Sequence, residues 1–342
     1  MKNLLPLSIF CNFAAVMEVI SMPMWAWILF YALVIVMLYA DLKLFGRKGQ
    51  HEVSIGEALK MTAIWIIVSL IFCGGIWHFE NTDKAMEFLA GYLIEKSLSM
   101  DNLFVFLMLF SFFGVQRKYQ HEVLFWGIFG ALILRSIFIF AGAAMVQRFE
   151  WILGIFGVFL IYTGIKMFSH KDDESVDPSK NIFVKLFKKF FPVTDQMHED
   201  KFFVKELRRE GEKEVIKRLA TPLFIALLVI ETTDVAFAVD SIPAVFSVSR
   251  DPFIVLTSNI FAILGLRALY FALAAIAKYF AYLKYGLGII LSFVGVKMLL
   301  EVSPAPFHYE VETPISLLII FGVLVLSMLA SYVATLYSRR RQ

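Results

Sequence analysis

Residues 227–246 read LLVIETTDVAFAVDSIPAVF, an apolar segment that is interrupted by three carboxylates, Glu231, Asp234 and Asp240. Together with its apolar flanks, the segment is long enough to cross a bilayer as one helix. Carboxylates at membrane depth are costly, and where they occur they usually line a pathway or bind a partner inside a helix bundle. Pro243 lacks a backbone N–H and is predicted to break the helix beside Asp240. An acidic, broken helix at this depth is typical of a cation site.

The composition is that of an integral membrane protein. Of the 342 residues, 59% are hydrophobic and 18% are charged, whereas a soluble chain carries about 25% charged residues. The net charge of +3 comes mostly from residues between the apolar segments, so nothing favours a nucleic-acid partner. Cys11 and Cys73 lie in separate apolar stretches, and no pair of the six histidines has metal-ligand helical spacing. We therefore predict no disulfide, no prosthetic group and no enzymatic activity.

Nine apolar stretches are predicted to span the membrane, because each is near or above the length of about 20 residues that crosses a hydrocarbon core. They are residues 24–41, 61–79, 86–114, 122–146, 150–168, 220–247, 253–277, 283–300 and 314–337. Lysine and arginine gather in alternate short loops, for example at Lys43 and Arg117, and acidic residues such as Glu80 lie in the others. The positive-inside rule then places the N-terminus outside and the C-terminus in the cytoplasm. The predicted fold is an all-α, polytopic helix bundle.

The chain divides into six parts. They are an N-terminal apolar extension (1–23), two leading transmembrane helices (24–80), a first three-span repeat (86–168), a charged and amphipathic cytoplasmic connection (169–219), a second three-span repeat (220–300) and a final helix with a basic tail (314–342). Residues 1–20 are interpreted as an interfacial stretch, or as sequence upstream of the true start, rather than as a tenth span. In the connection, Phe183, Leu186 and Phe187 share a helical face beside Lys185. That helix either lies on the inner membrane surface or packs in a small cytoplasmic domain.

Two parts of the chain repeat one another. EKSLSMDNL at 95–103 aligns with DVAFAVDSI at 234–242, LILRSIF around Arg135 with LGLRALY around Arg267, and GIKM at 164–167 with GVKM at 295–298. In the predicted topology the first copy runs inward and the second outward, so the units are inverted repeats. Secondary transporters often have this arrangement, and their sites lie where the repeats meet. Four glycines are predicted to permit close helix packing: Gly157, Gly164, Gly288 and Gly295.

The acidic residues of the two repeats could form one metal site. Residues six apart on an unbroken helix point about 120° apart, so Glu95 and Asp101 converge only if their helix breaks near Ser99. Glu231 and Asp234, three apart, share a face without any break. The predicted metal ligands are Glu95, Asp101, Asn102, Glu231, Asp234, Asp240 and Ser241. This oxygen-rich set suits hard divalent ions such as Mn²⁺, Ca²⁺ or Mg²⁺ and argues against Cu(I).

Other polar residues near the motifs are given supporting roles. Met100 could add a sulfur that favours a transition ion over Ca²⁺, although ordinary packing is the stronger interpretation. Arg135 and Arg267 are interpreted as counter-charges or helix locks, and five carboxylates against two arginines leave a surplus that needs a metal or protons. Asp41 is interpreted as a charge at the end of its helix. Four hydroxyl residues are expected to bond to helix carbonyls behind the ligands: Ser97, Ser99, Thr232 and Thr233.

Three stretches resemble the signatures of a known family. EKSLSMDNLFVF (95–106), TPLFIALLVIETTDVAFAVDSIPAVF (221–246) and SNIFAILGLRALYF (258–271) are similar to those of the TerC family of membrane proteins, and most of all to its Alx-type members. The resemblance runs from about residue 24 to 337. It implies a multi-pass protein of the bacterial inner membrane that exports Mn²⁺. It also implies that transport needs five carboxylates: Glu95, Asp101, Glu231, Asp234 and Asp240.

The predicted function is that of a secondary transporter. Carboxylates bind either a metal ion or protons, so one cluster could couple export of Mn²⁺ to the periplasm with entry of protons. The chain has no Walker A sequence to suggest ATP drive. Two alternatives stay open: an exporter of Ca²⁺ or another divalent ion, and a membrane scaffold that delivers metal to secreted proteins, or helps insert them, through residues 169–219. A redox enzyme is not favoured because no cofactor motif or cysteine pair is evident.

Overall fold

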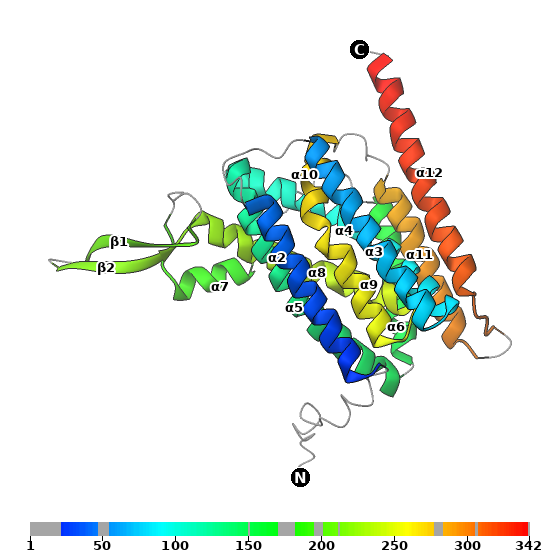
Figure 1. Cartoon of the computed structure of the whole chain (residues 1–342). Helices are drawn as coiled ribbons and strands as arrows, with labels where there is room; N and C mark the ends of the chain where they lie inside the picture. The colour runs from blue at the N-terminus through cyan, green and yellow to red at the C-terminus, as the bar shows by residue number, and fades with distance from the viewer. Residues whose placement is uncertain are drawn as a thin grey trace, which may run out of the picture.

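The protein is a bundle of long helices from which one β-hairpin projects, as Figure 1 shows. This computed structural model describes residues 22–46, 55–149, 151–169, 182–194, 201–210, 213–276, 283–304 and 307–340. The prediction of an all-α, polytopic membrane protein is confirmed, with the hairpin as a small addition. The interpretation of residues 1–20 lies outside the described residues.

The helices of the bundle follow one another up and down. The elements are α2 (Met24–Gly46), α3 (Ile55–Phe79), α4 (Thr82–Phe112), α5 (Arg117–Arg148), α6 (Trp151–Ser169), α7 (Ile182–Phe190), β1 (Phe203–Glu210), β2 (Lys213–Ala220), α8 (Pro222–Phe246), α9 (Pro252–Leu264), α10 (Leu266–Ile276), α11 (Leu283–Val302) and α12 (Thr313–Arg340). In Figure 1 the start of α2 and the end of α12 lie at opposite ends of the bundle. This agrees with an odd number of membrane crossings, which puts the two ends of the chain on opposite sides of the membrane. Which side is cytoplasmic stays a prediction.

Eight helical stretches in the described part of the chain are long and apolar enough to cross a membrane. They correspond to eight of the nine predicted spans, with α9 and α10 together making one of them. The one predicted span that is not among these eight is α4. Glu95, Lys96 and Asp101 interrupt its apolar sequence. Because α4 packs against α8, α9 and α12 inside the bundle, we treat it as a membrane helix as well.

The predicted helix breaks are wrong. Helix α4 runs through Ser99 without interruption, and α8 continues past Pro243 to Phe246. Pro243 lies in the last turn of α8, where it removes the hydrogen bond to the Val239 carbonyl without ending the helix. A 31-residue helix is about 47 Å long, so the ends of α4 extend beyond a hydrocarbon core. The break in the second repeat lies instead at Gly265, between α9 and α10.

The N-terminal end of α4 is held by polar contacts. Asn81 caps the helix by accepting from the Lys84 N–H at 2.8 Å. The Lys84 ammonium lies 3.1 Å from Asp251, just before α9, and 3.3 Å from Glu87. Burial lowers the pKa of the Lys84 amine, but these two carboxylates outweigh it, and the net direction is upward. The ion pairs therefore tie α4 to the α8–α9 connection.

Close contacts between α6 and α11 agree with a two-fold relation between the repeats. A Cβ added at Gly157 would lie 2.8 Å from the Gly295 carbonyl oxygen, and one at Gly288 would lie 2.9 Å from the Gly164 carbonyl oxygen. In the sequence alignment Gly157 matches Gly288 and Gly164 matches Gly295, so each contact is the image of the other. The extensive pairings of α5 with α8 and of α4 with α9 correspond in the same way. The prediction that these glycines permit close packing is confirmed.

The connection before α8 contains the predicted amphipathic helix and an unpredicted hairpin. In α7, Phe187 stacks against Phe191 and contacts Phe224 at the start of α8, with ring centroids 4.9 and 5.0 Å apart. Leu186 and Phe191 are exposed beside lysines, so one side packs on the bundle while the other stays available to a membrane surface. Strands β1 and β2 pair antiparallel from Phe203↔Ala220 to Glu210↔Lys213. Their charged sequences lack the alternating apolar pattern that would have predicted strands.

We predict that Gly295→Ala destabilises the bundle. The new Cβ would lie 2.5 Å from the Gly157 carbonyl oxygen and 3.0 Å from the Ile161 amide nitrogen, and neither backbone atom can move without shifting α6. We expect the free energy of unfolding in detergent micelles to fall by about 1–3 kcal/mol. Gly322→Ala in α12 is the matched control, since nothing lies within 4 Å of the added Cβ. Equal stability of the two variants would contradict the close helix contact.

Candidate functional site

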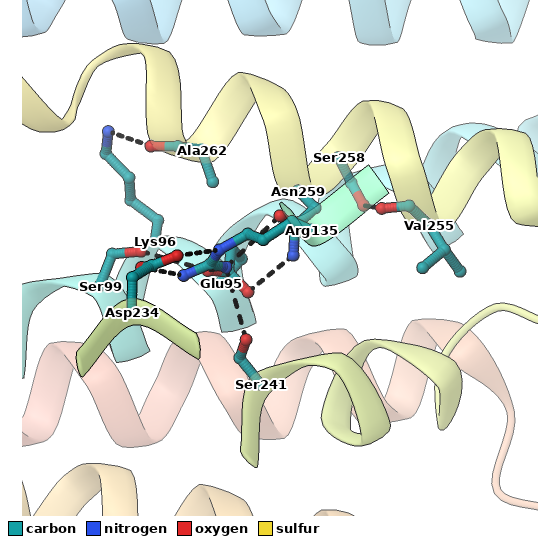
Figure 2. A network of polar contacts seen from close by, with 10 residues as sticks. All are labelled: Glu95, Lys96, Ser99, Arg135, Asp234, Ser241, Val255, Ser258, Asn259 and Ala262. Carbon is teal, nitrogen blue, oxygen red and sulfur yellow. Dashed lines mark hydrogen bonds and ion pairs between the residues drawn. The ribbon is translucent and has the colours of Figure 1, made fainter. Parts of the chain in front are cut away.

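The centre of the bundle contains one guanidinium shared by two carboxylates. Arg135, from the middle of α5, donates through Nη2 to Asp234 Oδ1 at 2.8 Å and through Nε to Asp234 Oδ2 at 3.1 Å. Its Nη1 donates to Glu95 Oε1. Figure 2 shows the guanidinium lying between these two side chains, which come from α4 and α8. Glu95 and Asp234 occupy corresponding positions in the two repeats, so the ion pairs join one repeat to the other.

Neutral polar groups complete this cluster. Asn259 of α9 donates through Nδ2 to Glu95 Oε2 at 2.9 Å, and Ser99 Oγ lies 3.3 Å from Glu95 Oε1. Arg135 Nη1 also lies 3.4 Å from Ser241 Oγ and from Asn259 Oδ1. Four helices, α4, α5, α8 and α9, therefore contribute to one hydrogen-bonded group, which we name the Arg135 cluster: Glu95, Ser99, Arg135, Asp234, Ser241 and Asn259.

The Arg135 cluster is buried and carries surplus negative charge. Arg135 is 1% exposed, Glu95 0% and Asp234 5%. A guanidinium stays protonated in proteins, so it can neutralise only one of the two carboxylates when both are ionised. In a low-dielectric interior an uncompensated carboxylate is costly. The cluster therefore favours an additional cation or proton.

Two further acidic side chains of α8 lie outside this cluster. Glu231 faces α5, because a Cβ added at Gly130 would overlap its carboxylate. Its Oε2 atom is buried without a hydrogen-bond partner in the described part of the chain. The prediction that Glu231 and Asp234 share a face is thus confirmed, since both point toward α5. Asp240 lies instead beside Thr163 and Lys166 of α6.

The predicted ligands are therefore only partly brought together. Glu95, Asp234 and Ser241 meet at Arg135, and Glu231 lies one turn of α8 away. Asn102 is buried in α4, and the side chain of Asp101 lies outside the described part of the structure. Among the residues described, no three acidic, histidine or cysteine side chains are placed to hold a metal ion. Without a break in α4 or α8, the ligand set does not converge on one point in this conformation.

A small cavity lies next to the cluster. It is lined by residues of α4, α5, α8, α9 and α10, with Asp234 as its acidic member. Gly127 and Ile128 line it from α5, and Ile230 from α8. In the predicted topology these residues lie on the cytoplasmic side of Arg135. Asp234 therefore borders a small cavity on that side of the cluster.

Comparison with known proteins agrees with the motif resemblance. Residues 80–341 match the integral membrane protein TerC family. The chain belongs to the TerC family. Proteins of Salmonella typhi and Escherichia coli strain K12, both named Alx as proposed membrane-bound redox modulators, are each 44% identical to it, over 91% and 92% of this chain and 95% of their own. The uncharacterized membrane protein STKORF319 of Myxococcus xanthus is 45% identical over 90% of this chain and 92% of its own. No solved structure matches.

The supporting residues of this TerC protein behave largely as expected. Ser97 donates to the Leu93 carbonyl, and Thr232 and Thr233 both donate to the Val229 carbonyl. Ser99 differs, because its hydroxyl bonds to the Glu95 carboxylate. Met100 is partly buried and packs against the apolar core, so packing explains it.

Arg267 pairs with Asp41, which agrees with its interpretation as a counter-charge or helix lock and corrects the interpretation of Asp41. Arg267 does not reach the Arg135 cluster: its Nη2 lies 3.0 Å from Asp41 Oδ2 and donates to the Asp41 carbonyl at 2.8 Å. The interpretation of Asp41 as a helix-end charge is wrong, since the residue is 3% exposed and forms a buried ion pair. That pair joins α2, which is outside the repeats, to α10.

Sequence reasoning missed two buried polar residues of this TerC chain. Asn259 lies in the apolar run of α9, every residue of which is buried. Lys96 follows Glu95 but points to the other side of α4, where its ammonium donates to the Ala262 carbonyl at 3.0 Å, as Figure 2 shows. That carbonyl lies in the last turn of α9, where a basic group is favourable. The rule that singled out the carboxylates, a polar group at membrane depth, would have found both residues.

We predict that Asp234→Ala lowers the free energy of unfolding by about 3–5 kcal/mol, because it leaves the Arg135 guanidinium short of a buried partner. The double variant Asp234→Ala/Arg135→Leu should recover much of this loss. Unfolding in mixed micelles, analysed as a double-mutant cycle, measures both effects. Glu310→Ala is the control, since that side chain is 73% exposed and its loss should change stability by less than about 0.5 kcal/mol. Additive effects of the two cluster substitutions would contradict the ion pair.

Proposed function

We propose that this protein is a secondary transporter that exports Mn²⁺ from the cytoplasm to the periplasm in exchange for protons, in the inner membrane of a bacterium. One observation supports the proposal most: carboxylates from both repeats meet at the centre of the bundle with fewer positive charges than negative ones. A buried cluster of this kind is a general marker of ion and proton pathways in membranes. Its oxygen donors suit a hard divalent ion.

The repeat architecture supplies a route for alternating access. In transporters with inverted repeats, one repeat rocks against the other about a site at their interface. Here Glu95 belongs to the first repeat and Asp234 to the second, so relative movement of α4 and α8 would change the distance between the two carboxylates. In the predicted topology Glu231 lies about one turn of α8 nearer the cytoplasm than Asp234, so an ion from that side would meet it first. Asp240 lies one to two turns beyond Asp234, toward the opposite face.

Other cargoes and another class of function are weighed against this proposal. Oxygen ligands discriminate weakly between Mn²⁺ and Ca²⁺, so a Ca²⁺ exporter is the first alternative. The second is a scaffold that passes metal to secreted proteins, or helps insert them, through the connection that carries α7 and the hairpin. The relatives named Alx are described as modulators of redox state. Of this chain's two cysteines, the structure describes Cys73, whose thiol donates to the Ala85 carbonyl at 3.4 Å.

Metal flux tests the transport proposal. Everted membrane vesicles that contain the wild-type chain should take up Mn²⁺ and release protons from the lumen. Glu95→Gln and Asp234→Asn should abolish both fluxes, because each removes a central carboxylate and keeps its size. Asp101→Ala and Asp240→Ala are expected to abolish them as well, and Glu310→Gln should not. Mn²⁺ uptake that survives in the Glu95→Gln/Asp234→Asn double variant would reject the site, and preference for Ca²⁺ would favour the first alternative.

Shortening the hairpin separates a transporter from a scaffold. Replacing residues 206–217 with Asn-Gly would close the strands one pair beyond Val204↔Leu219, with Lys205 and Arg218 flanking a two-residue turn. The contacts at its base would be kept, including the Thr221 N–H to the Phe202 carbonyl at 3.0 Å. We expect Mn²⁺ flux in vesicles to stay within about twofold of wild type, because the removed segment projects from the bundle and contributes no residue to the Arg135 cluster (Figure 1). Loss of Mn²⁺ flux together with loss of metal delivery to secreted enzymes would favour the scaffold.

A further inference from the structure

We infer that the Arg135 guanidinium is a built-in competitor of the transported cation: it occupies the carboxylate pair between transport events, and the cation binds by displacing it. The inference rests on the proposed function. It says that Arg135 sets how tightly the Arg135 cluster binds the cation. It concerns Arg135 of α5, a residue of the first repeat that touches a carboxylate of each repeat.

The competition follows from shared oxygen atoms. Arg135 directs three N–H donors at three carboxylate oxygens: Asp234 Oδ1, Asp234 Oδ2 and Glu95 Oε1. The fourth oxygen, Glu95 Oε2, accepts from Asn259. A divalent ion that bridges Glu95 and Asp234 at about 2.0–2.6 Å would bind oxygens that already accept from Arg135. Each oxygen has a second lone pair, so the competition is for space and charge around the same oxygens.

Charge repulsion reinforces the steric competition. Two cations that share a buried site repel each other far more strongly than they would in water. Arg135 cannot relieve this repulsion by losing a proton, since its guanidinium stays charged. It must move away from at least one carboxylate when a metal ion enters. Ser241 Oγ and Asn259 Oδ1, both 3.4 Å from Nη1, lie at the outer limit of hydrogen bonding and offer acceptors for the displaced group.

The competitor also explains how the cluster persists without cargo. Two bare carboxylates at the centre of a bundle would repel each other and lack solvation. The Arg135 fork satisfies both at once and holds α4 and α8 together. Hydrogen bonds from one guanidinium to both carboxylates therefore keep α4 and α8 together while no cargo is bound. Competition from Arg135 should weaken cation binding and speed cation release.

Arg267 provides a matched comparison within the same chain. It corresponds to Arg135 in the repeat alignment and is equally buried, at 1% exposure. Its ion pair is with Asp41 rather than with the repeat carboxylates. Removing it should therefore cost stability without changing how tightly the cluster binds a cation.

Mn²⁺ binding to the purified full-length chain in lipid nanodiscs tests the inference, with free Mn²⁺ measured by its electron paramagnetic resonance signal. We expect Arg135→Gln to lower the apparent Kd for Mn²⁺ by about tenfold or more and to slow Mn²⁺ exchange in vesicles. Arg135→Lys keeps the charge but loses the fork, so its Kd should lie between those of the wild type and the glutamine variant. Arg267→Gln should bind Mn²⁺ with the wild-type Kd.

A purely structural arginine predicts the opposite result. Unchanged or weaker Mn²⁺ binding by Arg135→Gln, in a protein that elutes as a folded species, would overturn the inference while leaving transport by the wild type intact. If Arg135→Gln does not fold, the lysine variant decides, and a Kd no lower than that of the wild type counts against competition. Mn²⁺ binding and flux that are absent from every form would overturn the proposed function together with the inference.

Discussion

The ion pairs of Arg135 are the interaction on which the rest of the bundle depends. A guanidinium donates its hydrogen bonds in its own plane and at fixed angles. Helices α4 and α8 must therefore hold Glu95 and Asp234 in that plane, on two sides of the group. Asn259 adds α9 through its bond to Glu95 Oε2 at 2.9 Å. Each charge is buried, and none could be buried alone without a large loss of solvation free energy. The positions of four helices are therefore coupled through one side chain.

The same cluster gives the molecule its chemical character. Positive charge falls short of negative charge at Arg135, and Glu231 adds a carboxylate oxygen that is buried without a hydrogen bond in the described residues. Asp240 has different surroundings, because it lies beside Thr163 and Lys166 of α6. The acidic residues of α8 thus face two neighbouring helices rather than one ion. A cation that moves along α8 would meet Glu231, Asp234 and Asp240 in turn, each in a different electrostatic setting.

Much of this organisation could be predicted from the sequence. Span length and the repeat of EKSLSMDNL in DVAFAVDSI were enough for the bundle, its two units and the residues at their interface. Pro243 misled the prediction, since a membrane helix can continue through a proline that removes one of its hydrogen bonds. The ion pair between Asp41 and Arg267 could not be predicted from the sequence either. The two residues are separated by 226 residues, and only helix packing brings them together. Asn259 was overlooked for a simpler reason: a neutral amide stands out less than a carboxylate, although both need a partner when buried.

The two arginines show where the symmetry of the repeats ends. Two-fold related units offer two equivalent positions for a buried cation, at Arg135 and at Arg267, but Glu95 and Asp234 form only one pair of carboxylates. Both guanidinium groups must nonetheless be neutralised, since neither can lose its proton. Helix α2, which has no counterpart in the repeats, supplies Asp41 to the second arginine at 3.0 Å. The leading helices therefore contribute to the electrostatics of the core, because Asp41 pairs with a guanidinium that lies outside the Arg135 cluster.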